Sequence, residues 1–87
     1  MMEQEIRELL EEISYRQVGY EKNHYYIEGA FSRVYVVIMN IQSMLIIREY
    51  VGSIKKHIIE LPLMCFRRSE LKELLIGYRD EALKAEL

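Results

Sequence analysis

Apolar residues near the N-terminus recur at spacings of three and four. The set consists of Met2, Ile6, Leu9, Leu10 and Ile13. Residues at this spacing share one face of a helix, and the charged residues between them take the other face. Acidic side chains early in a helix also suit the positive end of its dipole. The pattern predicts an amphipathic helix over residues 2–13.

The chain returns to helical spacing after Pro62. Ser69 is a favourable N-cap, and Glu70 follows it in the first turn. An apolar stripe then consists of Leu71, Leu74, Leu75, Tyr78, Ala82 and Leu83. Gly77 lies inside this second predicted helix, where it costs about 1 kcal/mol relative to alanine. We therefore expect Gly77 to mark a kink, a helix end or a close packing contact.

Tyrosines and β-branched residues dominate the middle of the chain, which favours strands. The predicted strands cover residues 14–20, 24–28 continuing through Phe31 to 39, 44–51 and 54–61. Polar links at residues 21–23 and 40–43 and a tight turn at 52–53 separate them. Gly29 falls inside a strand pattern, so it indicates a bulge or a bend. Connections this short imply antiparallel neighbours.

The order of elements predicts an α+β fold with an N-terminal helix, a four-stranded antiparallel sheet and a C-terminal helix. With 87 residues the chain has the length of a single domain, residues 1–87. Hydrophobic residues make up 51% and charged residues 30%, which is ordinary for a globular protein. We expect two layers, with both helices on one face of the sheet.

Strand alternation predicts what each face of the sheet carries. Val34, Val36 and Ile38 form a wholly apolar set, which should lie under the helices. The opposite face then carries basic, aromatic and apolar side chains together. The candidate partner-binding residues on it are Tyr26, Arg33, Tyr35, Ile46, Arg48, Tyr50 and Lys56, with His24 beside them. Val37, Met39 and Met44 should cluster with Ile46 at one end of this face.

The inventory of chemically active groups is thin. Cys65 is the one cysteine, so no internal disulfide can form, and it lies in an apolar run that predicts a core position. His24 and His57 could meet only on neighbouring strands, and a third metal ligand would still be missing. The acidic side of the first helix is most simply a solvated surface. We therefore expect no catalytic residues, no metal and no cofactor.

The predicted compartment and the distribution of charge limit which partners the protein can bind. The absence of disulfides, of a signal-like N-terminus and of a membrane-length apolar run predicts a cytoplasmic protein without membrane contact. The net charge is −2 overall, but residues 33–68 carry +4 and the two flanking segments are acidic. Positive groups gathered on one surface can bind nucleic acid even when the net charge is small.

Two classes of function fit these observations best, and neither is an enzyme. The first is a small protein-binding module, acting as a regulator, adaptor or inhibitor through the sheet face, and self-associating there as a homodimer. Compact acidic chains of this size are typical of accessory regulators, including those of phages and mobile elements. The alternative is a single-stranded nucleic-acid-binding protein that uses the Tyr/Arg face. A third possibility is a small enzyme, or an enzyme subunit completed by a partner.

Overall fold

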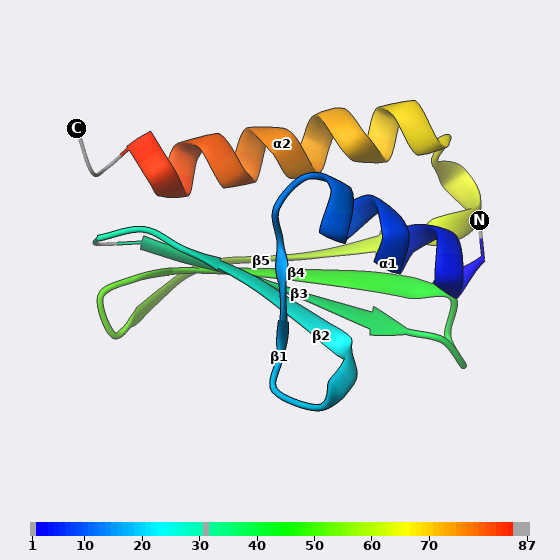
Figure 1. The fold of residues 1–87 in the computed structure, drawn as a ribbon, viewed down its shortest axis with the longest axis horizontal. Helices are drawn as coiled ribbons and strands as arrows, with labels where there is room; N and C mark the ends of the chain where they lie inside the picture. Colours follow the sequence, from blue (N-terminus) through cyan, green and yellow to red (C-terminus); the bar gives the residue numbers. More distant parts are fainter. Residues whose placement is uncertain (1, 31, 85–87) are drawn as a thin grey trace.

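The structure, a computed structural model, describes residues 2–30 and 32–84. It confirms an α+β fold in which an N-terminal helix, an antiparallel sheet and a C-terminal helix follow one another (Figure 1). The predicted count of four strands is wrong, because the sheet has five, paired in sequence order. The elements are α1 (Glu3–Glu12), β1 (Arg16–Val18), β2 (Glu21–Glu28), β3 (Ser32–Met39), β4 (Met44–Val51), β5 (Ile54–Pro62), the short 3₁₀ helix η1 (Leu63–Cys65) and α2 (Arg68–Lys84).

The sheet has a fifth strand because the chain turns at Gly29, where the sequence suggests a bulge or a bend within one long strand. The backbone N–H of Gly29 donates a 2.8 Å hydrogen bond to the carbonyl of Ser32, which closes a hairpin between β2 and β3. A Cβ at position 29 would lie 2.1 Å from the carbonyl oxygen of Ala82. The end of α2 therefore passes so close to this hairpin that only glycine fits there without displacement.

The first hairpin also turns earlier than predicted. Gly19, with a φ of +52°, lies in the turn after β1, and Glu21 already begins β2. Residues 21–23, which the sequence suggests as a polar link, belong to that strand. The first strand is correspondingly short, at three residues.

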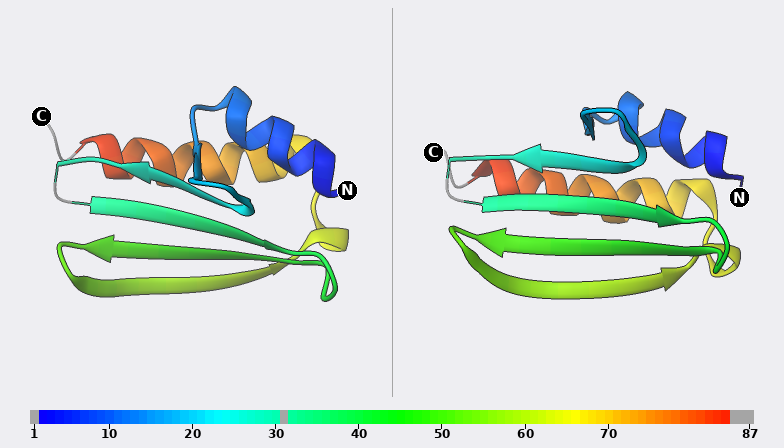
Figure 2. Two further views of the ribbon diagram at one scale, coloured as in Figure 1. Left: turned by 60° about the horizontal axis from the view of Figure 1, so that its bottom comes forward. Right: turned by 90° about the horizontal axis from the view of Figure 1, so that it is seen from below.

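Both helices cover the same face of the sheet, as predicted (Figures 1 and 2). Ile6, Leu9 and Leu10 of α1 are fully buried, and Leu71 and Leu75 of α2 are buried beside them, whereas Met2, which the pattern assigns to the same stripe, is 73% exposed. Val34, Val36 and Ile38 of β3 lie beneath them in the same core cluster. The alternation of β3 therefore assigns its two faces correctly.

Polar contacts join α2 to α1 and to the segment that follows α1. The hydroxyl of Tyr15 donates a buried 2.7 Å hydrogen bond to the carbonyl of Leu75, and burial raises the pKa of this phenol strongly. Glu12 accepts hydrogen bonds from Arg68 and Lys72, and the bond from Arg68 is the main reason why the pKa of Glu12 is lowered. These contacts fix the end of α1 against α2.

Helix α2 begins before the predicted cap. Its first residue is Arg68, and the side chain of Glu70 accepts a hydrogen bond from the backbone N–H of Arg67. The helix runs through Gly77 to Lys84, and a Cβ at Gly77 would meet nothing within 4 Å. Gly77 is therefore neither a helix end nor a close packing contact. No helix in the described part of the chain is long and apolar enough to cross a membrane.

Candidate functional site

The face of the sheet opposite the helices carries no covering layer formed by residues 2–30 or 32–84 (Figure 2). We call it the open face. Cross-strand pairing and strand alternation arrange its side chains in four rows that run across β2 to β5. The rows are, in order, Glu28, Arg33, Tyr50 and Lys55; then Tyr26, Tyr35, Arg48 and Ile58; then His24, Val37, Ile46 and Glu60; and last, on β3 to β5 alone, Met39, Met44 and Pro62.

The first two rows bring three tyrosines together; with Arg33 and Arg48 we call them the aromatic half. The ring centroids of Tyr35 and Tyr50 lie 5.6 Å apart with their planes at 89°. The ring of Tyr26 follows on the other side, with its centroid 6.3 Å from that of Tyr35. Such edge-to-face pairs add about 0.5–1.5 kcal/mol beyond the area they bury. The rings therefore form a packed cluster and not three separate surface side chains.

Arg33 is built into this cluster. Its guanidinium carbon lies 5.9 Å from the ring centroid of Tyr35 and 5.8 Å from that of Tyr50. The same group donates hydrogen bonds to the Tyr35 hydroxyl at 3.5 Å and to the Gly52 carbonyl at 3.1 Å. A cation within about 6 Å of a ring centroid is attracted by the ring quadrupole. Arg33 is therefore held in one place, and one side of each of these two rings is occupied.

The last two rows supply an apolar half, which consists of Val37, Met39, Met44 and Ile46. Val37 is only 7% exposed because its neighbours crowd it, and the two methionines and Ile46 are half-buried. Ile58 continues the apolar surface toward β5 and is 42% exposed. The predicted clustering of these side chains near the 40–43 turn is confirmed by the pairing of Met39 with Met44 and of Val37 with Ile46.

Six of the seven predicted partner-binding residues lie on the open face, namely Tyr26, Arg33, Tyr35, Ile46, Arg48 and Tyr50. The placement of Lys56 is wrong. Its ammonium group lies 3.4 Å from the carboxylate of Glu49, on the side of the sheet that faces α2. The pairing register shifts between Glu49 and Tyr50, which face His57 and Lys55 respectively. This bulge adds one residue to β5, so Lys55 takes the predicted position.

The pairing register also places on the open face three residues that were not among the seven candidates. Ile58 pairs with Arg48, Glu60 with Ile46 and Glu28 with Arg33. The open face therefore carries two acids among its bases. Strict alternation already places Ile58 and Glu60 on one face of β5, and only the exchange of Lys56 for Lys55 depends on the bulge.

The structure also gives the positions of the two histidines, the cysteine and the possible metal ligands. Strands β2 and β5, which carry His24 and His57, are separated by β3 and β4, so these histidines do not meet on neighbouring strands. The predicted core position of Cys65 is wrong, because this residue is exposed. The turn of η1 buries Leu63 and directs Met64 and Cys65 to solvent. Among the described residues, no three His, Cys, Asp or Glu side chains gather as metal ligands.

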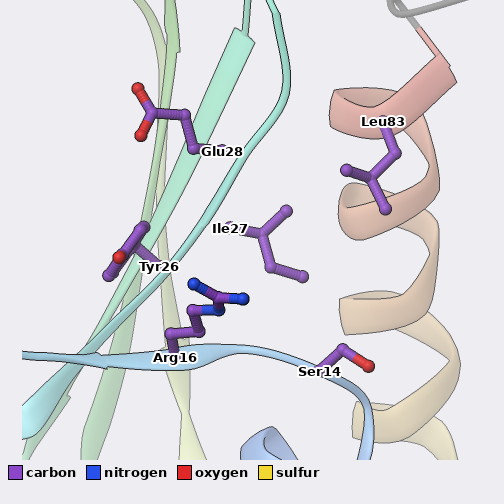
Figure 3. A pocket seen from close by; sticks show the side chains of 6 residues that line it. All are labelled: Ser14, Arg16, Tyr26, Ile27, Glu28 and Leu83. Carbon is purple, nitrogen blue, oxygen red and sulfur yellow. The ribbon is translucent and has the colours of Figure 1, made fainter.

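Two shallow hollows lie beside α2. One, of about 360 Å³, lies between β1, β2 and the end of α2, and Figure 3 shows Ile27 pointing toward Leu83 while Tyr26 and Glu28 point away from that helix. The other, of about 500 Å³, lies between β4, β5 and α2. Tyr78 lines it, and burial, with a further contribution from Glu49, raises the pKa of this tyrosine. Both are open, and neither has a set of converging catalytic groups.

Comparison of the chain with protein-family models, curated proteins and solved structures finds no match. Function is therefore inferred from the geometry of the open face.

Proposed function

We propose that this chain is a small non-enzymatic protein-binding module, a regulator, adaptor or inhibitor, that acts through the open face. The observation that supports this most is the contiguity of the two halves. Half-buried Met39, Met44 and Ile46 adjoin a packed cluster of three tyrosines and Arg33. Tyrosine, methionine and arginine are enriched at protein interfaces, and an apolar surface with a polar rim is typical of them.

The state of Arg33 also favours a protein partner. Hot spots are enriched in tyrosine and arginine held in well-packed surroundings. The guanidinium of Arg33 lies over two rings and is tied to the Gly52 carbonyl. Such an anchor loses little further side-chain entropy when a partner binds.

Single-stranded nucleic acid is the second candidate, because rings interleaved with arginines can stack bases and contact phosphates. Two observations weigh against it. Arg33 occupies one side of both the Tyr35 and the Tyr50 rings, and these rings meet edge to face. Glu28 and Glu60 lie on the same face, and their charge opposes a phosphate backbone.

An oligonucleotide titration separates the two candidates. We expect no binding of a labelled single-stranded oligonucleotide at micromolar protein concentration, at low or high salt. The comparison uses wild type, the double variant Tyr35→Ala/Tyr50→Ala, and Tyr20→Ala as a control in a fully exposed turn. Salt-sensitive binding that Tyr20→Ala retains and the double variant loses would show that the open face binds nucleic acid and would contradict our proposal.

Capture from the native host tests the protein-binding proposal directly. Tagged wild-type protein should retain a partner that Ile46→Asp does not retain. Ile41→Asp makes the same substitution in the exposed 40–43 turn and should behave as wild type. Equal capture by all three proteins would contradict a role for the open face.

A further inference from the structure

We infer that a second copy of this chain occupies the open face, packed face to face about a two-fold axis that runs across the strands. This inference rests on the proposed function, because it names the partner of the same surface. A homodimer is the commonest closed assembly, and its interface must be complementary to itself.

The edges of the sheet are poor sites for self-pairing. Edge strands that avoid pairing are short, bulged or rich in lysine and proline. Strand β1 has three residues, whereas β5 contains a bulge beside Lys55 and Lys56 and ends at Pro62. Self-association by strand addition is therefore disfavoured at both edges, and the open face is the remaining apolar surface of the sheet.

The direction of the two-fold axis follows from the rows. An axis along the strands would leave each row over the same row of the partner, so the two aromatic halves would meet and bring Arg33 and Arg48 of both copies together. An axis across the strands, between the second and third rows, instead places each aromatic half over the partner's apolar half. Tyr35 then faces the partner's Val37, and Tyr50 faces the partner's Met44. Sulfur–aromatic contacts of this kind are favourable.

Charge complementarity supports the same axis. The second row lies over the partner's third row, so Arg48 comes one strand away from the partner's Glu60. This pair occurs twice by symmetry. No base in the four rows faces another base of the partner.

The size of the face suits a small specific dimer. Four strands about 4.8 Å apart and about 26 Å long give a planar area of roughly 500 Å² per copy. Two copies contribute on the order of 1,000 Å² before the relief of the side chains is added, which reaches the lower range of specific interfaces. An interface this small suggests a dimer that dissociates on dilution.

A charge-reversal mixture tests the pairing of Arg48 with the partner's Glu60. Arg48→Glu alone places two acids together at both junctions, and Glu60→Arg alone places two bases together. Each variant should dimerise at least about tenfold more weakly than wild type, because like charges across an interface are strongly unfavourable. In an equimolar mixture, both junctions of the heterodimer join opposite charges. The mixture should therefore dimerise where neither variant does, which a contact within one chain cannot produce.

Sedimentation velocity over a concentration series gives the measurement. Wild type and Ile41→Asp should approach twice the monomer mass, Ile46→Asp should remain monomeric, and circular dichroism should show that all are folded. A mixture that stays monomeric while wild type dimerises would refute this axis. A wild type that stays monomeric at every concentration would overturn the second-copy inference altogether. In that case, capture of a different protein that depends on Ile46 would still support the proposed function, and failure of both would remove it.

Discussion

Two glycine-to-alanine substitutions should have opposite effects on stability. At Gly29 the new Cβ would lie 2.1 Å from the carbonyl oxygen of Ala82 and 3.0 Å from its carbon. An ordinary carbon–oxygen contact needs about 3.3 Å or more, so the hairpin or the last turn of α2 must move by about 1 Å. Overpacking of this kind costs about 1–3 kcal/mol of unfolding free energy. At Gly77 a Cβ meets nothing within 4 Å, and alanine in a helix is favoured by about 0.8–1.0 kcal/mol.

Urea denaturation followed by circular dichroism measures both effects. All proteins must be compared at one concentration, because the stability of a dimer depends on concentration. Gly29→Ala should lower the midpoint, Gly77→Ala should raise it, and the slope should stay unchanged. In thermal unfolding, each kcal/mol corresponds to roughly 4–8 °C for a domain of this size. A Gly29→Ala protein as stable as wild type would refute the close approach of α2, and a destabilised Gly77→Ala would refute the open space at that helix position.

Three further predictions concern single side chains. Tyr15→Phe should cost about 1 kcal/mol in urea denaturation, because the buried carbonyl of Leu75 loses its hydroxyl donor; an unchanged midpoint would contradict this bond. The lowered pKa of Glu12 contributes stability that is present above the carboxyl's ordinary pKa and is lost as the pH falls through its folded pKa. Glu12→Gln should therefore make stability fall less steeply on acidification, and identical pH profiles would argue against the pairing with Arg68. Cys65→Ser should leave stability and capture of the partner unchanged, since the thiol is exposed; a loss of capture would point to a role for the thiol.

The helices and the faces of the central strand could be predicted because each depends on local periodicity. Ile6, Leu9 and Leu10 follow the helical repeat, and all three are fully buried. Val34 and Val36 alternate with Arg33 and follow the repeat of a strand. In both cases the pattern is long enough to specify which side of the element faces the core.

The hairpin at Gly29 could not be placed because its cause is not local. The apolar alternation continues on both sides of Gly29, so the sequence resembles one long strand. The long strand is interrupted because the backbone of Ala82, near the other end of the chain, lies close to Gly29. A turn that is imposed by tertiary packing leaves only an isolated glycine as its sequence signal, and that signal also fits a bulge.

The errors at Lys56 and Cys65 have a different origin. A bulge adds a residue to β5, so every side chain between it and the 52–53 turn changes face relative to strict alternation. Cys65 lies in an apolar run that resembles a core segment in the sequence. The helix η1 forms within that run, and of the three residues of η1 only Leu63 is buried. Candidate side chains near the β4–β5 turn and after Pro62 could therefore be assigned only from the structure.

The two arginines of the aromatic half have different roles in any interface formed there. The guanidinium of Arg33 lies over two rings and donates a hydrogen bond to the Gly52 carbonyl, so these contacts contribute to the stability of the fold as well as to binding. Arg48 is exposed, so its charge is available to a partner. An available charge governs specificity and association rate more than packing. Reversal of charge at Arg48 therefore reports on the partner, whereas the same change at Arg33 would also disrupt the tyrosine cluster.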